Sequence, residues 1–234
     1  GKRVENGLND IGLTGRDIDA ILITHEHIDH IAGLGVLSRR YGIPIYTTEK
    51  TADAIQETKS VGKIPEELFH PVCAEEAFTI KDLTVNPMRI SHDAADPVGY
   101  RFSYGSSHAA VCTDLGTYND YTVECLKGMD VLLLEANHDV NMLQVGSYPY
   151  YLKQRILGNR GHLSNENSGR LLSRVLHDNL KKVILGHLSQ ENNLPELAYE
   201  TVRMEIDLAD NPYHGGDFPI QVAKRNEVSE MICF

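Results

Sequence analysis

Four side chains that can bind a metal ion fall within a stretch of six residues, in the pattern His-x-His-x-Asp-His. They are His25, His27, Asp29 and His30, and they follow a run of apolar or β-branched residues at 21–24. That run predicts a buried strand, which would hold the next loop rigidly at a sheet edge. In an extended loop the first two histidines point the same way and can share one ion, whereas the last two ligands are offset and can face a second. Imidazole with carboxylate suits zinc, and also manganese or iron.

The same arrangement, a ligand-type residue where an apolar run ends, recurs along the chain. The further examples are His92, Asp114, Glu135 and His187. The ends of strands on one side of a sheet converge in space, and α/β proteins bind their ligands there. We therefore expect these side chains to gather with the His25 loop. A solvated polar loop remains the alternative for any one of them.

The His-x-His-x-Asp-His motif resembles that of the metallo-β-lactamase-fold hydrolases. The run His30–Tyr46, the sequence Glu-Ala-Asn-His-Asp at 135–139 and Gly-His-Leu-Ser-Asn at 161–165 are similar to the bacterial YycJ (WalJ/VicX-type) branch. The resemblance covers nearly the whole chain. It implies an α/β fold, the αββα sandwich, as one domain spanning residues 1–234. Relatives begin with two or three strands before their first helix, so we expect this chain to lack those strands.

The resemblance also implies a cofactor of two divalent ions, of Zn, Mn or Fe. One ion would be held by His25, His27 and His92, the other by Asp29, His30 and His187, with Asp114 bridging them. The two ions would lie ~3.5–4 Å apart. Such a pair acidifies a shared water into a hydroxide and neutralises charge that builds on the reacting centre. Asp29 would orient the hydroxide.

Glu135 and His162 match a pair that protonates the leaving oxygen in the nuclease branches of this fold. A carboxylate that holds an imidazole raises its pKa and fixes its tautomer, as a general acid requires. The alternative for His162 is a helix-capping role. For His138, support of the site and a plain structural role stay equally open.

Charge is unevenly distributed along the chain. The net charge is −11, which argues against indiscriminate nucleic-acid binding. Residues 149–182 nevertheless carry seven basic and two acidic side chains, so this window is +5. A local basic surface on an acidic body suggests an anionic ligand, although a solvated helix face would look the same.

Several residues in this window are candidates for contacting a nucleic acid. Arg155 and Arg160 flank the His162 loop and suit bidentate phosphate contact. Ser164 and Asn165 either donate to a phosphate or cap a helix. Three tyrosines (Tyr148, Tyr150 and Tyr151) either stack on bases or pack in the core.

The composition is that of an ordinary soluble globule, with 41% hydrophobic and 24% charged residues. No run approaches the roughly 18 apolar residues of a membrane span, and no signal peptide opens the chain. The four cysteines form no Cys-x-x-Cys pair, which predicts free thiols and a reducing cytoplasm. The oligomeric state is open.

Apolar periodicity and turn residues predict alternating strands and helices. Strands are expected at residues 19–24, 44–47, 77–80, 83–90, 98–104, 109–113, 131–135, 183–185 and 220–223. Helices are expected at the start of the chain and at residues 31–41, 49–59, 118–127, 165–177 and 193–209. Helical segments are expected after the strand at 131–135, with Leu152, Ile156 and Leu157 at helical spacing and interruptions at Gly158 and Gly161. This alternation is typical of a layered α/β protein.

The sequence thus predicts a metal-dependent phosphodiesterase acting on nucleic acid, with His162 as general acid. The resemblance implies a 5′→3′ exonuclease on DNA rather than RNA. One alternative is a hydrolase of thioesters or small cyclic phosphates. The other is a regulatory protein that retains the fold.

Overall fold

The computed structural model describes all 234 residues, which divide into two compact units. Unit 1 comprises Gly1–Arg89, Ala94–Val98 and Lys224–Glu230. Unit 2 comprises Ile90–Asp93, Gly99–Ala223 and Met231–Phe234. No helix of the chain combines the length and the apolar character needed to cross a bilayer.

Unit 1 contains four helices and five strands. The helices are α1 (Lys2–Asp10), α2 (Ile28–Ile31), α3 (Leu34–Tyr41) and α4 (Glu49–Glu57), with short 3-10 turns at Gly15–Asp17, Lys59–Val61 and Glu66–Leu68. The strands are β1 (Ile21–Leu22), β2 (Ile45–Thr47), β3 (Phe69–Pro71), β4 (Phe78–Ile80) and β5 (Leu83–Arg89). The first three form a parallel sheet in the order β1-β2-β3, and the last two pair as an antiparallel hairpin.

An apolar cluster holds the β1 sheet against the helices of unit 1. It is made of Ile23, Ile31, Leu34, Ile45, Ile55, Val61 and Ile64, all buried. Strand β1 is shorter than the predicted 19–24, although the amide of Ile23 still donates to Tyr46 O at 3.0 Å. The predicted helix at 31–41 is instead two helices, because the chain turns at Ala32 and Gly33. The packed sheet fixes the loop that begins at Thr24.

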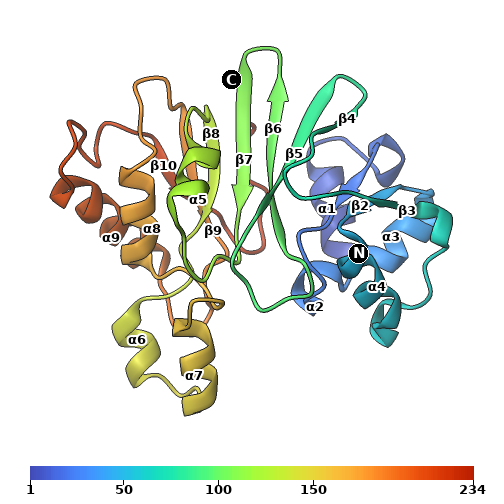
Figure 1. Cartoon of the computed structure of the whole chain (residues 1–234), viewed down its shortest axis with the longest axis horizontal. Helices are drawn as coiled ribbons and strands as arrows, with labels where there is room; N and C mark the ends of the chain where they lie inside the picture. Colours follow the sequence, from blue (N-terminus) through green and yellow to red (C-terminus); the bar gives the residue numbers. More distant parts are fainter. The chain divides into compact units, whose positions relative to one another are not determined.

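Unit 2 contains five helices and five strands. The helices are α5 (Asp120–Leu126), α6 (Val140–Val145), α7 (Tyr150–Leu157), α8 (Asn165–Ser173) and α9 (Pro195–Leu208). The strands are β6 (Val98–Tyr104, whose first residue belongs to unit 1), β7 (Ser107–Cys112), β8 (Val131–Glu135), β9 (Lys182–Gly186) and β10 (Ile220–Val222). Helices α5, α8 and α9 lie on the same side of β8–β10 (Figure 1).

The strands of unit 2 lie in the order β10-β9-β8-β7-β6. Strands β7 to β10 are parallel to one another, and β6 pairs antiparallel with β7. In the central strand the residues Val131, Leu132 and Leu134 are buried, as a strand covered on both faces requires. Parallel strands bring their carboxyl ends to one edge, so the residues that follow β7, β8 and β9 lie close together.

A helical excursion, residues 139–162, leaves this edge after β8 and carries α6 and α7. In Figure 1 these two helices lie together at the end of unit 2 opposite the β6–β7 turn. The excursion leaves and returns at one place. There the amide of Asn137 donates to Leu163 O and the amide of Asn165 donates to His138 O, both at 2.9 Å. The six-residue α6 was not resolved from sequence, because so short a helix has too weak a period.

Candidate active site

Three strand ends of unit 2 deliver acidic and imidazole side chains to one place. Asp114 lies two residues after β7, Glu135 is the last residue of β8, and His187 follows β9. The ligand-type atoms of these residues and of His162 all lie within 4.8 Å of one another. The structure therefore brings together four of the predicted site residues in unit 2, while their roles remain predictions.

Two of these positions have left-handed backbone conformations. Asp114 has φ of 59° and His187 has φ of 58°. Residues with a Cβ adopt this region at a cost of about 1 kcal/mol or more, and such strain clusters at functional sites. In each case the turn follows directly on a buried parallel strand, whose packing stabilises it.

Glu135 is fully buried and accepts four hydrogen bonds. Its Oε1 accepts from Nδ1 of His162 at 2.8 Å and from Nδ1 of His187 at 2.7 Å. Its Oε2 accepts from the amides of Leu115 at 2.9 Å and Leu163 at 3.0 Å. A carboxylate can only accept, so both imidazoles carry a proton on Nδ1. This leaves Nε2 of His187 as the atom with a lone pair, which suits a metal ligand oriented by a carboxylate.

The hydrogen bonds at Glu135 also set its charge and that of His162. Burial raises the pKa of Glu135, but the hydrogen bonds and charges of His162 and His187 outweigh it and lower that pKa to about 2. Burial lowers the pKa of His162, but the hydrogen bond and charge of Glu135 outweigh it and raise that pKa above 6.5. An imidazole whose pKa is raised in this way, and whose Nδ1–H is held by a carboxylate, is suited to give a proton from Nε2.

His92 completes a set of donors that fits a divalent ion. Its Nδ1 donates to Gly161 O at 3.0 Å, and its Nε2 lies 3.7 Å from Oδ1 of Asp114. Nε2 of His187 lies 3.5 Å from the same oxygen. Two ligands about 2.0–2.1 Å from one tetrahedral ion lie roughly 3.4 Å apart. The spacing of these three atoms therefore matches ligands that share a cation.

The loop that carries His92 is held by the chain between α7 and His162. Ser91 Oγ donates to Asn159 O at 2.7 Å, and Arg160 Nε donates to His92 O at 3.0 Å. The neighbouring Asp93 carboxylate accepts hydrogen bonds from Nε (2.5 Å) and Nη2 (3.1 Å) of Arg155. The position of His92 thus depends on the same segment that leads into His162.

The His-x-His-x-Asp-His loop of unit 1 is compact. The ring of His25 lies 4.6 Å from that of His27 and 4.1 Å from that of His30, centroid to centroid. Oγ1 of Thr24 lies 3.0 Å from Nδ1 of His25 and 3.3 Å from Nδ1 of His30. Both Nε2 atoms therefore face away from Thr24. His25 is buried, whereas Asp29 is exposed and has an oxygen 3.7 Å from Nε2 of His30.

The predicted phosphate-binding residues lie in different environments. Arg160 is exposed, and its Nε is anchored to His92 O, whereas Arg155 is already paired with Asp93. Ser164 is buried and caps α8 through the amide of Asn167, which is the alternative left open from sequence. Asn165 has no exposed surface, and its amide pairs with Asn193 at 2.9 Å. These environments support a phosphate contact only at Arg160.

Sequence reasoning missed three residues that position the others. They are Thr24, Asp93 and Gly161. Asp93 could have been singled out because it follows a candidate ligand directly. His138 is buried, and its Nδ1 lies 3.3 Å from the side-chain oxygen of Asn137. Asn137 also donates to His187 O at 2.9 Å, so this pair supports the turn at His187.

Comparisons with known proteins identify the family of the chain. The family model described as the beta-lactamase superfamily domain matches residues 8–187. The chain is 42% identical over 210 residues to the exodeoxyribonuclease WalJ of Streptococcus pneumoniae, which covers 90% of this chain and 78% of that protein. It is 38% identical over 207 residues to the exodeoxyribonuclease YycJ of Bacillus anthracis, covering 88% and 78%.

A solved structure shows the same fold at low identity. The crystal structure of Zn²⁺-bound PqqB from Methylobacterium extorquens matches with a TM-score of 0.65 and 18% identity, covering 92% of this chain and 73% of that one. The α/β fold predicted from the motif is therefore confirmed. The chain belongs to the beta-lactamase superfamily, in the YycJ branch of its metallo-β-lactamase-fold members.

Proposed function

We propose that this protein is a metal-dependent 5′→3′ exonuclease that cleaves DNA. The observation that carries the proposal is the Glu135 carboxylate, which holds His162 and His187 with one oxygen, in a chain 42% identical to an exodeoxyribonuclease. Phosphodiester cleavage expels an alkoxide, which is a poor leaving group and benefits from an acid. A DNA substrate also fits the cytoplasmic location predicted from the cysteines.

The fold and the clustered histidines and aspartates indicate a divalent-metal-binding protein. We propose two ions, of zinc, manganese or iron, with the ligands that the family resemblance implies. These are His25, His27 and His92 for one ion, Asp29, His30 and His187 for the other, and Asp114 between them. Such ions, when bound, would supply Lewis acidity for attack on phosphorus and would stabilise the charge that develops there.

The chain's own groups would do the rest. His162, protonated and held at Nδ1 by Glu135, is placed to give the proton on Nε2 to the departing oxygen. As it becomes neutral, the negative charge of Glu135 is still balanced by three other donors. Arg160, anchored by Nε beside His92, offers its remaining N–H groups to a backbone phosphate. Asp29 would orient the attacking water.

The experiment that tests this function is a nuclease assay with end-labelled strands. Single- and double-stranded DNA and RNA, labelled at either end, are incubated with each candidate metal. We expect stepwise shortening of DNA from its 5′ end. Bis-p-nitrophenyl phosphate, nitrocefin and a glutathione thioester are assayed in parallel. Preference for nitrocefin or the glutathione thioester would mean that the protein is a hydrolase of small substrates and not a nuclease.

Two variants separate the acid from the metal ligands. His162→Ala should lower phosphodiester cleavage by about 100-fold or more while metal content holds, since a positioned acid contributes roughly 10²–10⁴-fold. Asp114→Ala should lose both activity and metal. His214→Ala, at an exposed histidine whose imidazole lies near Asp207, is the control. Loss of metal in His162→Ala would refute the assignment of His162 as the general acid. A metal content well below two ions per wild-type chain would favour a regulatory protein.

A further inference from the structure

The α6–α7 excursion differs in composition from the rest of the protein. Over residues 139–162 it carries three basic side chains and one acidic one, Asp139, which caps α6, in a chain whose net charge is −11. The same segment holds three of the eleven tyrosines. Two of these, Tyr150 and Tyr151, are 76% and 75% exposed, and Val145 at the end of α6 is 87% exposed. Large apolar side chains that are this exposed indicate a contact surface.

The basic groups of the excursion keep much of their charge. Nζ of Lys153 donates only to the carbonyl oxygens of Gln144 (2.8 Å) and Gly146 (2.7 Å). Arg160 likewise donates only to a carbonyl oxygen, whereas Arg155 is balanced by Asp93. Uncompensated cations beside exposed aromatic rings suit a polyanion with flat, stackable faces, which is the chemistry of a single nucleic-acid strand.

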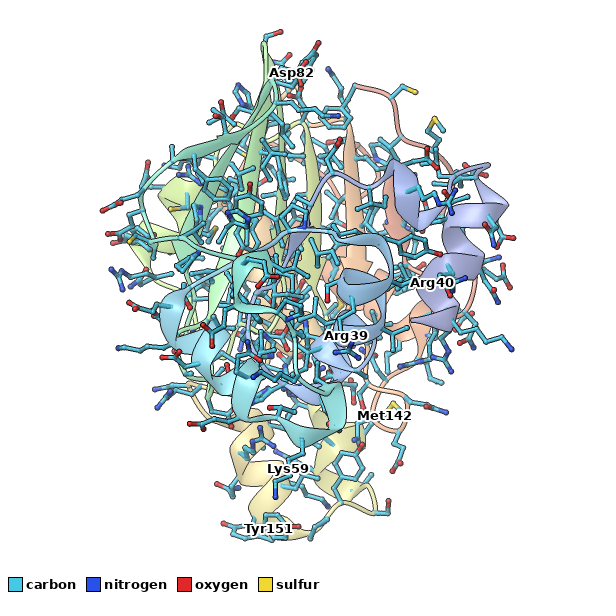
Figure 2. All side chains as sticks on the ribbon, turned by 90° about the vertical axis from the view of Figure 1, so that its right-hand side faces the viewer. Arg39, Arg40, Lys59, Asp82, Met142 and Tyr151 are labelled. Atoms are coloured by element: carbon cyan, nitrogen blue, oxygen red, sulfur yellow. The ribbon has the colours of Figure 1, made fainter.

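The two exposed tyrosines lie on different faces of α7. Tyr151 and Arg155 are four residues apart and share one stripe of the helix. That stripe leads to the active site, because Arg155 is bound to Asp93, the neighbour of His92. Tyr150 shares its stripe with Lys153, which is bound to the end of α6. Figure 2 shows Tyr151 at the tip of the excursion, pointing away from the strands of unit 2.

We propose that Tyr151 is a stacking platform for a base of the uncleaved, 3′ part of a single DNA strand. The proposal rests on the exonuclease function proposed above. Helix α7 has eight residues and is roughly 12 Å long, which corresponds to about three to four nucleotides at the 3.4 Å rise of a base-stacked strand. Its far end therefore contacts bases a few nucleotides beyond the scissile bond. Its near end joins the active site, since the amide of His162 donates to Ile156 O at 3.0 Å.

The test compares exposed tyrosines on substrates of different length. Tyr151→Ala, Tyr150→Ala and Tyr104→Ala each remove one exposed ring, and Tyr104 lies at the β6–β7 turn, at the opposite end of unit 2 (Figure 1). Each variant is assayed on a single strand of about a dozen nucleotides, within the range that such platforms bind, on a dinucleotide and on bis-p-nitrophenyl phosphate. Binding of the long strand is measured in parallel by fluorescence anisotropy.

We expect Tyr151→Ala to lower kcat/KM on the long strand, and its affinity, by about 5- to 100-fold, the usual loss per stacked base. Tyr151→Phe should retain both, because a phenyl ring stacks as well. The dinucleotide and bis-p-nitrophenyl phosphate should be cleaved at the wild-type rate, since neither reaches the platform. Tyr104→Ala should match the wild type, and Tyr150→Ala should lose clearly less than Tyr151→Ala.

Other outcomes overturn the platform. Equal losses on all three substrates would mean that Tyr151 only supports the fold. Tyr151→Ala could instead leave cleavage of the long strand and affinity for it unchanged. If it then loses binding to anionic lipid vesicles, the ring contacts a membrane, and if it loses dimerisation, the ring contacts a second copy of the chain. If the wild type cleaves no oligonucleotide, the proposed function fails, and the anisotropy measurement still decides whether Tyr151 binds a strand.

Discussion

Replacing Glu135 by glutamine tests the central hydrogen-bond arrangement of the site. The change keeps the size of the side chain and removes its charge. Oε2 accepts hydrogen bonds from two backbone N–H groups, which can only donate. The side-chain oxygen of glutamine must therefore take the place of Oε2. The new NH₂ group then faces Nδ1 of His162 and His187, where a proton acceptor stood before. Both imidazoles must move or shift their proton to Nε2, the atom that should bind metal or substrate.

The cost to stability can be worked out from the pKa of Glu135. Burial raises that pKa, but the bonds and charges of the two imidazoles lower it from 4.5 to about 2. This difference corresponds to about 3 kcal/mol in favour of the charged side chain. Glutamine resembles the protonated acid, so we expect Glu135→Gln to lose about 3 kcal/mol, less than the stability of a typical domain. Metal affinity should fall by about 10- to 100-fold.

The pH dependence gives an independent check. A carboxylate whose pKa is lowered on folding stabilises the protein above its unfolded value, and this contribution is lost as pH falls through its folded value. Denaturant titrations of the metal-free wild type should therefore show falling stability from about pH 4.5 toward pH 2. Glu135→Gln should lack that part of the slope.

Asp130→Asn supplies the matched control. Asp130 precedes β8 at its other end, is also buried, and accepts the amide of His108 at 2.8 Å. It should lose stability with no change in metal affinity, which is read by competition with a chromophoric chelator. The reasoning is refuted if Glu135→Gln binds metal like the wild type, or if Asp130→Asn loses metal equally.

Three further changes probe the surroundings of the site. Gly161→Ala should lower activity at least tenfold and also weaken metal binding, because a Cβ there would lie 2.1 Å from a carbonyl oxygen of α7 and would displace the carbonyl that holds His92. Gly158→Ala should change both far less, because its Cβ would lie 3.2 Å from the nearest carbonyl oxygen. Asp93→Asn breaks the ion pair with Arg155, so metal titration should show weaker binding while activity at saturating metal recovers. Burial lowers the pKa of His138 from 6.5 to about 4. The stability of the wild type should therefore fall by up to about 3 kcal/mol as the pH drops through this range. Denaturant titrations of His138→Asn should show a smaller fall over the same range.

Much of the fold could be predicted because its signals are local. The apolar run at Val131–Glu135 predicted β8 to the residue, and its final carboxylate lies where a parallel strand delivers it. The short strand Phe69–Pro71 was missed, because His70 and Pro71 are poor strand formers and only pairing with β2 makes them extended. Tertiary pairing of this kind leaves no pattern in the sequence.

The site was predicted less completely, because its contacts join distant parts of the chain. Pairing of Glu135 with His162 was expected, but the second bond to His187 depends on loops that close over 52 residues. Arg155 looked like a phosphate ligand because its partner Asp93 lies 62 residues away and resembles any surface acid. Residue type indicates what a side chain can bind, whereas only the closed loops decide which partner it finds.

Residues 139–162 leave and rejoin the core at one place, which two backbone hydrogen bonds close, and this has an evolutionary consequence. A segment closed at its base can lengthen, shrink or be exchanged without rethreading the sheet, and each doubling of a loop costs only about 0.6 kcal/mol. The bonds between Asn137 and Leu163 and between His138 and Asn165 would survive such a change. Substrate preference in this branch can therefore change by exchange of this one segment. Transplanting the segment between relatives is a direct way to redesign that preference.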